Sequence, residues 1–297
     1  MKPLHLGTSA LLAGLLCQGF NGQAQSLLNG FFSGKGHGSV VVSGTTESYH
    51  NVFLVPEKVD GVPVFRRITI NSVSLYGTYG FGNKVEGVLS VPYIRSAGEA
   101  DSRLLNSENQ PYANSRGNFQ DVTGLLKFKA FSRDLGSSVL DLTGAVGLST
   151  PLGNYKQEAS LDYIVAIGNR ATKFNTVGVA QLKMASGVFV AGQAGYSLRS
   201  GRVPNAFVAE TKLGYAGPRL YLDAWADFQQ SNSGTDILQP GFDNYFPATR
   251  VNYTRVGVSG FRPIAKGLGL SLAVSTYVAG RNVGQSTAYS VGVAYNF

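Results

Sequence analysis

The sequence contains little cysteine, histidine or charge. Of its 297 residues one is cysteine and three are histidine, and 14% are charged, whereas about a quarter of a typical soluble domain is charged. The single cysteine, Cys17, lies in a stretch that we expect to be cleaved off, which leaves the mature chain without a disulfide or a thiolate metal site. The low charge argues against an ordinary soluble surface.

Long hydrophobic runs are also missing. Beyond the N-terminus no stretch approaches the roughly 18 consecutive apolar residues of a membrane-spanning helix, although 43% of the residues are hydrophobic. Because lipid admits only helices and closed barrels, an apolar chain of this kind is expected to form a β-barrel. The 38 glycines and 15 tyrosines are also typical of a membrane β-barrel, since small residues let strands bend and tyrosines suit the membrane interface. A water-soluble β-sandwich is the alternative.

The N-terminus has the features of a secretory signal. Lys2 precedes an apolar run from Leu6 to Leu16, and small residues follow at Gly22 and Ala24. We therefore predict a signal peptide at 1–24, a periplasmic N-terminal segment at 25–36 and a single barrel domain at 37–297. Loss of Lys2 lowers the formal charge from +8 to +7. This excess favours acidic lipid head groups or anionic solutes as partners, and scattered cations on an exported chain argue against nucleic acid.

Twelve segments alternate with a period of two over the length that a tilted transmembrane strand needs. They are 37–46, 69–80, 85–94, 119–131, 139–149, 172–184, 188–199, 206–215, 219–229, 251–261, 268–279 and 286–297. The connections alternate between tight turns, such as "FGNK" and "ASG", and long stretches, such as 95–118 and "SNSGTDILQPGFDNYFPAT". Outer-membrane barrels have short periplasmic turns, long outer loops and an even strand number. The predicted fold is therefore all-β, a single antiparallel outer-membrane barrel of about twelve strands in a Gram-negative-type bacterium.

The chain ends in "AYSVGVAYNF", in which large apolar residues alternate with small or polar ones. Tyr289, Val291, Val293, Tyr295 and Phe297 are predicted to face lipid. Tyr295 and Phe297 would then lie at the periplasmic interface. This ending also resembles the C-terminal signal that the outer-membrane β-barrel assembly machinery recognises, which implies that machinery as a partner.

The opposite faces of the strands carry charge, which hydrocarbon does not accommodate, so they are predicted to face the interior. The candidate lumen-lining residues are Glu86, Lys127, Lys129, Asp141, Lys183, Arg199, Glu210, Lys212, Arg219, Tyr221, Asp223, Trp225, Asp227 and Arg255. Two interpretations remain open. The charges could form a paired network that fills a narrow barrel, or they could line a conduit in which aromatic faces take a planar or apolar solute.

Catalytic chemistry has few candidates. His37 and Ser39 would share one face of a strand, as a base and a nucleophile require, and the stretch resembles the H-x-S-N-G motif of outer-membrane phospholipase A. Val40, however, stands where that motif has Asn. We expect no catalytic residues, no metal and no cofactor, and we keep a lipid-modifying enzyme only as a third alternative.

Residues 68–155 resemble a known family. The stretch "SVSLYGTYGFGNKVEGVLSVPYI", followed by "NFQDVTGLLKFKAF" and "GLSTPLGNY", is similar to the outer-membrane family named for the meta pathway of phenol degradation. Gln120–Asp121 stands where that family usually has Gly–Asp. The resemblance implies uptake of small hydrophobic or aromatic compounds. The predicted function is a channel or uptake protein for such solutes, and the alternative is a closed barrel with a surface-binding or structural role through its outer loops.

Overall fold

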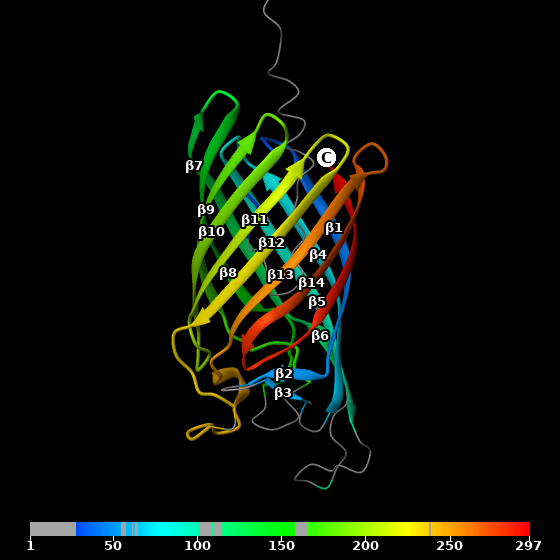
Figure 1. Cartoon of the computed structure of the whole chain (residues 1–297), viewed down its shortest axis with the longest axis vertical. Coiled ribbons are helices and arrows are strands. Elements are labelled where there is room, and N and C mark those ends of the chain that lie inside the picture. Colours follow the sequence, from blue (N-terminus) through cyan, green and yellow to red (C-terminus); the bar gives the residue numbers. More distant parts are fainter. Residues whose placement is uncertain are drawn as a thin grey trace, which may run out of the picture.

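The chain forms a closed antiparallel barrel (Figure 1). The computed structural model describes residues 28–54, 58–60, 62, 65–100, 109, 115–157, 165–237 and 239–297. The strands of the wall are β1 (Gly38–Tyr49), β4 (Phe65–Gly80), β5 (Val85–Ala100), β6 (Ser115–Phe119), β7 (Asp121–Asp134), β8 (Ser138–Pro151), β9 (Lys173–Met184), β10 (Val188–Arg199), β11 (Ala206–Ala216), β12 (Tyr221–Ser231), β13 (Asn252–Pro263), β14 (Leu268–Arg281) and β16 (Thr287–Asn296).

The wall has twelve strands, because β6 and β7 pair with successive parts of β5 and continue one another. Neighbours in sequence are neighbours in the sheet, and β1 closes the barrel by pairing with both β16 and β4. The predicted fold class and strand number are confirmed. Strand ends differ by a few residues: β4 begins at Phe65, β5 runs on to Ala100 and β6 begins at Ser115, so the long loop expected at 95–118 is shorter.

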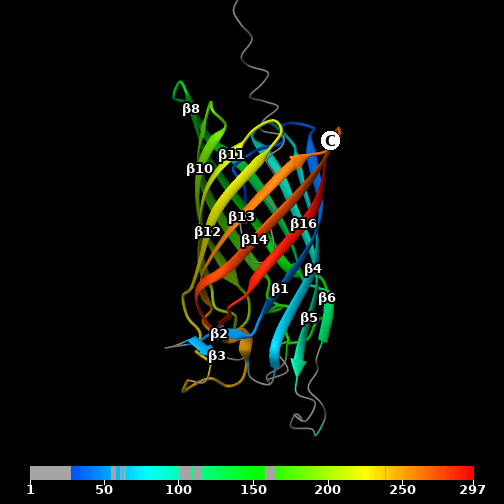
Figure 2. The same cartoon turned by 45° about the vertical axis from the view of Figure 1, so that its right-hand side comes forward.

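The two ends of the barrel differ as predicted. One end, here called the turn end, carries both barrel termini and the short connections 81–84, 135–137, 185–187, 217–220 and 264–267. The other, called the loop end, carries a small sheet of β15 (Val283–Gly284), β2 (Asn51–Phe53) and β3 (Lys58–Asp60). Figure 2 shows this sheet across the barrel mouth, opposite the C-terminus. The small sheet was not predicted.

The outer face of the barrel is apolar. In β16 and the residue after it, the side chains of Tyr289, Val291, Val293, Tyr295 and Phe297 are 47–57% exposed, whereas Ala288 and Ala294 on the other face are buried. The predicted outward face of the last strand is therefore confirmed. Exposed aromatics also gather near both rims: Tyr79, Phe81, Phe128, Tyr215 and Tyr295 toward the turn end, and Tyr93, Phe119, Phe174 and Phe207 toward the loop end. Such girdles are typical of barrels that cross a membrane.

A β-bulge interrupts the wall between β6 and β7. Ser90 pairs with Thr123 and Tyr93 with Phe119, so two residues of β5 face three residues of the neighbouring strand. Pro92 lies at this point and cannot donate a ladder hydrogen bond, but its carbonyl accepts one from Gln120 N at 2.9 Å. The extra residue turns two consecutive side chains, Gln120 and Asp121, toward the interior, as bulges beside functional sites often do.

Helical structure in the described ranges is limited to the 3-10 turn η2 (Phe246–Ala248). None of the described segments forms a helix that is long and apolar enough to cross a membrane.

The orientation predicts a labelling pattern. Ser233 is exposed at the loop end and Ser137 is exposed at the turn end. The single cysteine, Cys17, lies in the predicted signal peptide, so the mature chain is expected to have no other thiol. Ser233→Cys on whole cells should then react with a membrane-impermeant maleimide and Ser137→Cys should not. Equal labelling of the two variants in intact cells, with full labelling of both after lysis, would show that the orientation is wrong.

Candidate functional site

The inward faces of the strands carry the predicted lumen residues. Those that lie on an inward face are Glu86, Lys127, Lys129, Asp141, Lys183, Arg199, Glu210, Lys212, Tyr221, Asp223, Trp225, Asp227 and Arg255. Arg219 does not: it lies exposed in the turn before β12, which begins at Tyr221. That prediction was wrong because the strand pattern was extended two residues into the turn. Glu47, Asp121 and Lys173 also face inward and were missed.

Residues 28–33, here called the plug, lie inside the turn end of the barrel. Leu28, Gly30, Phe31 and Ser33 are buried, and the chain leaves the lumen at the rim to enter β1. The segment 25–36 was predicted to lie in the periplasm, whereas its described residues 28–33 fill the interior. The plug therefore occupies space that a wall of twelve strands leaves open.

A buried ion pair anchors the plug to the wall. Lys127 Nζ lies 2.6 Å from Glu86 Oε1, and the two side chains are 2% and 1% exposed. Lys127 also donates to the carbonyl oxygens of Phe31 at 2.5 Å and Asn29 at 3.2 Å, while Glu86 Oε2 accepts from Ser33 N at 2.6 Å. Each charge is thus paired and also bonded to plug backbone, which a buried pair requires to offset its desolvation.

Apolar contacts complete the plug. The Phe31 ring packs edge-on against Phe189 with centroids 5.3 Å apart, and Lys127 Nζ lies 4.3 Å from the centroid of the Phe32 ring. Leu28 and Phe31 belong to one buried cluster that includes Phe189 and Tyr221 of the wall. The turn end is therefore packed by aromatic and cation–π contacts.

Glycines allow the chain to turn from the plug into the wall. Gly34 and Gly36 have φ of 85° and 77°, conformations that glycine adopts without strain. Gly36 N donates to Gly80 O at 2.8 Å. A Cβ on Gly80 would lie 1.9 Å from the carbonyl oxygen of Gly34, so only glycine at the end of β4 lets the connection pass this closely.

A cavity of about 390 Å³ lies beyond the plug, toward the loop end. Its apolar lining includes Tyr76, Val88, Leu125 and Val177, which also pack in the cluster that contains Phe31 of the plug. Its polar lining includes Asp121, Asn169, Lys173, Asn175, Gln193, Arg199, Glu210, Asp227 and Gln229, and two tyrosines, Tyr253 and Tyr277, complete it. The volume lies in the range of small-molecule pockets.

Five strands contribute a continuous polar row to this region. The register places Gln193, Glu210, Asp227, Arg255 and Tyr277 directly opposite one another from β10 to β14. The Gln193 amide donates to Glu210 Oε1 at 2.5 Å, and Arg255 Nη2 donates to Ser275 Oγ at 2.7 Å. Arg255 also lies over the Tyr277 ring, 4.7 Å from its centroid. The opposed charges of Asp227 and Arg255 stabilise the sheet, whereas the two opposed carboxylates Glu210 and Asp227 repel each other.

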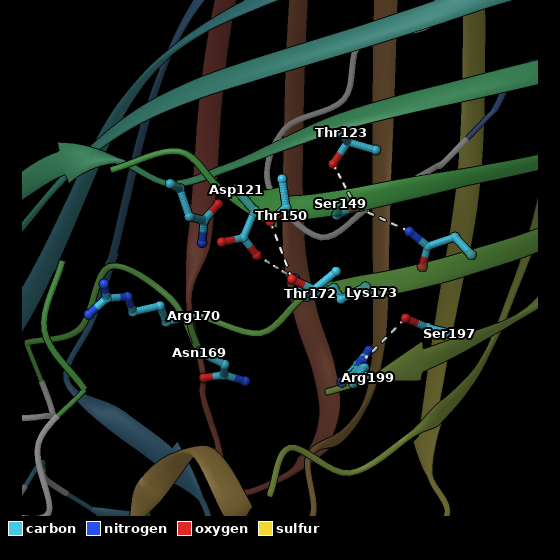
Figure 3. Close-up of polar contacts among 12 residues, drawn as sticks. Asp121, Thr123, Ser149, Thr150, Asn169, Arg170, Thr172, Lys173, Ser197 and Arg199 are labelled. Carbon is cyan, nitrogen blue, oxygen red and sulfur yellow. Dashed lines mark hydrogen bonds and ion pairs between the residues drawn. The ribbon is translucent and has the colours of Figure 1, made fainter. Parts of the chain in front are cut away.

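The bulge residues attach a loop-end segment to the wall. Asp121 accepts from Lys173 Nζ at 2.8 Å (Figure 3). Asp121 also accepts from the Tyr155 hydroxyl. The Gln120 amide donates to Ile167 O at 2.6 Å. Tyr155 and Ile167 belong to the described parts of the connection 152–172, which are 152–157 and 165–172, so the bulge residues Gln120 and Asp121 anchor both parts to the wall.

Loop-end residues cover the mouth of the barrel. Val165 is fully buried against Phe65 and Ile68, and Ile167 packs with Ile94 and Tyr155. Together with the small sheet these residues form the cover. Val251 and Val283, also from the loop end, line the cavity, so the cavity lies between the plug and the cover.

A polar clasp holds the connection 232–251. Asp236 accepts two hydrogen bonds from Arg281, at 2.7 and 2.5 Å, and one from Asn282 at 2.9 Å. The bonds from Arg281 lower the pKa of the Asp236 carboxyl, against a smaller opposing effect of burial, and the bond from Asn282 lowers it further. The Asn282 amide also donates to Arg250 O at 2.8 Å.

The suspected catalytic pair does not come together. His37 lies exposed at the turn-end rim with Nδ1 3.3 Å from Phe297 O, whereas Ser39 is fully buried and bonds to Thr78. A serine without a base beside it has no route to activation. The other histidine of the described residues, His50, is exposed.

Comparison with solved structures supports the fold. An outer-membrane channel from Pseudomonas putida superposes with a TM-score of 0.67 at 14% identity, over 94% of this chain and 100% of that chain. The KdgM porin has a TM-score of 0.47 at 10% identity, over 86% of this chain and 99% of that chain. The translocator domain of the autotransporter NalP from Neisseria meningitidis has a TM-score of 0.44 at 13% identity, over 88% of each chain. The first match shares the fold of this chain, and the other two are too distant to add to it. Neither a protein-family model nor a curated protein sequence matches this chain.

The plug anchor predicts a large effect of a single substitution. Glu86→Ala leaves the Lys127 ammonium buried without its carboxylate, so the free energy of unfolding should fall by about 3–5 kcal/mol. Adding Lys127→Met to that variant removes the stranded charge and should recover part of the loss. Denaturant unfolding of the purified protein measures both, with the exposed turn residue Lys84→Ala as the control. A Glu86→Ala protein as stable as the control would contradict the anchor.

The clasp predicts a pH dependence. Because the folded-state pKa of Asp236 is lowered, the clasp should stabilise the connection 232–251 at pH above the ordinary aspartate value of about 4, and this stabilisation should be lost as pH falls through the lowered value. The measurement is hydrogen-exchange protection of 232–251 in the wild type relative to Asp236→Asn. The difference should be constant near neutral pH and should vanish in strong acid. A difference that does not change with pH would exclude the charged clasp.

Proposed function

We propose that this chain is an outer-membrane uptake channel in which the plug controls passage and the cavity holds a small solute with an aromatic or apolar body. The observation that carries the proposal is the placement of the cavity between the plug and the cover, with an apolar floor and polar walls. Clefts of this composition bind small molecules by burying an apolar part and orienting a polar part. The family resemblance of residues 68–155 agrees with this solute class.

Passage requires the plug to move. Among the described residues the chain leaves the plug through Gly34–Gly36, and the side chains of Glu86, Lys127 and Thr78 hold the plug by hydrogen bonds. A displacement of residues 28–33 toward the turn end leaves every strand pair of the wall intact. The solute would enter past the cover and leave where the plug had been.

Location and assembly belong to the same proposal. Export would use the signal at 1–24, the turn end would face the periplasm, and the assembly machinery would recognise the strand that ends in Tyr295 and Phe297. The protein's partners would then be this machinery and outer-membrane lipid.

A second candidate is a closed barrel with a surface-binding or structural role. It is favoured by the covering of both ends, the plug at one and the cover at the other. The two candidates differ in whether the plug leaves the lumen.

A reversible lock on the plug tests the proposal. Ser33 Oγ and Thr78 Oγ1 lie 3.3 Å apart, close enough for a disulfide between cysteines at these positions after small adjustments. In the Ser33→Cys/Thr78→Cys protein, solute flux into proteoliposomes should fall to the level of protein-free vesicles on oxidation and return on reduction. The two single variants, treated in the same way, serve as controls.

Deletion of residues 28–33 provides the complementary variant. It should raise ion conductance in a planar bilayer, because the described side chains that remain at the turn end then belong to the wall. If flux through the wild type is already at the vesicle background, and the deletion leaves conductance near zero, the closed-barrel candidate is correct and the uptake channel is not.

A further inference from the structure

The inward cations of the wall from β7 to β13 are matched with carboxylates, with one exception. The matched cations are Lys127, Lys129, Lys173, Lys183, Lys212 and Arg255, and each lies 2.6–3.6 Å from an Asp or Glu oxygen. Arg199, on β10, has no carboxylate within ion-pair distance among the described residues. Its guanidinium donates to two neutral oxygens, Gln229 Oε1 at 2.9 Å and Ser197 Oγ at 3.4 Å.

Arg199 also faces a second cation. The register of β9 and β10 places it directly opposite Lys173, and both residues line the cavity. Like charges in opposed positions destabilise a sheet. Asp121 binds Lys173 and Arg199 has no carboxylate partner among the described residues, so Lys173, Arg199 and Asp121 together carry one excess positive charge. The arrangement weakens the fold locally and is the kind of local conflict that is expected at a functional site.

Neighbouring groups leave the guanidinium available to a ligand. The two bonds of the Arg199 side chain involve Nε and Nη2, and Nη1 with its two N–H groups has no acceptor in the part of the chain that the structure describes. Gln229 is itself fixed, because its amide donates to Val251 O at 3.0 Å. Figure 3 shows Arg199 and Lys173 extending from adjacent strands, with Asn169 across from them. A planar oxyanion is the ligand that this guanidinium edge fits.

Apolar groups lie in the same cavity. Val177 and Leu125 line it on the plug side, and Tyr253 and Tyr277 pack edge-on with centroids 5.2 Å apart. A ligand whose anionic group reaches Arg199 therefore places the rest of its body against apolar side chains and aromatic rings. A free inorganic anion would leave these surfaces without a partner.

We propose that the cavity binds a small amphiphilic monocarboxylate, such as an aromatic acid, and that Arg199 with Lys173 recognises its carboxylate group. This inference rests on the proposed uptake function for its biological meaning, but binding itself does not require passage. Arg199 is then the residue that decides between a charged solute and a neutral solute of equal size.

Calorimetric titration of the purified full chain in neutral detergent at low salt tests the inference. The probes are benzoate, its neutral counterpart benzamide, and acetate, which has the carboxylate without the ring. Wild-type protein should bind benzoate about tenfold or more tightly than either of the others, since a charge-assisted hydrogen bond contributes about 1.5–3 kcal/mol. Added salt should weaken benzoate binding. Equal affinity for benzoate and benzamide would overturn the role of the carboxylate, and equal affinity for benzoate and acetate would overturn the amphiphile.

Three variants separate recognition from structure. Arg199→Gln should lose about tenfold in benzoate affinity and none in benzamide affinity, Arg199→Lys should retain part of the preference, and the exposed Lys266→Gln should behave as wild type. Arg199→Gln should melt no lower than wild type, because it relieves the repulsion with Lys173. A lower melting temperature with unchanged benzoate binding would make Arg199 a structural residue and refute the inference.

The outcome is separable from that of the uptake proposal. Selective benzoate binding with no flux through the unlocked plug would retain the site and reject the channel. Flux that responds to the plug lock, with no preference for benzoate over benzamide, would retain the channel and reject the carboxylate site.

Discussion

The structure depends on the closure of one antiparallel sheet behind an apolar outer face. In lipid every backbone N–H and C=O must find a partner within the protein, so the sheet closes on itself and has no free edge. Closure in turn fixes which side chains meet hydrocarbon and which meet the interior, because successive residues of a strand alternate between the two. A wall of twelve strands encloses more space than its own side chains fill, and the molecule uses that space for the plug at one end and a cavity at the other.

The two halves of the interior follow different chemistry. Near the turn end, the charges Glu86 and Lys127 are paired and bonded to plug backbone, as a dry packed region requires. Toward the loop end, the polar residues surround a cavity, and Arg199 has only neutral partners among the described residues. The paired network of the first interpretation is therefore present at the turn end, and the cavity on which the proposed uptake depends lies toward the loop end.

Much of the fold could be predicted from the sequence, because strand alternation and loop length are local patterns. The alternation has few exceptions in a barrel of this kind, since hydrocarbon would exclude polar side chains from the outer face. The inward faces were predicted from the free-energy cost of placing charge against hydrocarbon. The prediction for Arg219 was wrong because the sequence of the turn before β12 continued the alternation of the strand. The plug could not be predicted in this way, because residues 28–33 have no period-two pattern. Its signal was composition: Leu28, Phe31 and Phe32 are too apolar for a solvated linker. Arg199 was predicted to face inward, but its lack of a carboxylate depends on which residues lie opposite, and register is a property of the folded wall.

The bulge at Gln120 and Asp121 has a consequence for the lengths that related chains can have. Loops at the rim can gain or lose residues, because the flanking strands fix the positions of the loop ends whatever the loop length. A single deletion at position 120 or 121 would instead reverse the inward and outward directions of the side chains in β6, which precedes the bulge. Phe119 would leave the lipid-facing band and Asn118 would enter it, and the anchors of the connection 152–172 would be lost together. Variation in length should therefore be tolerated a few residues away in the loop and excluded at the bulge itself.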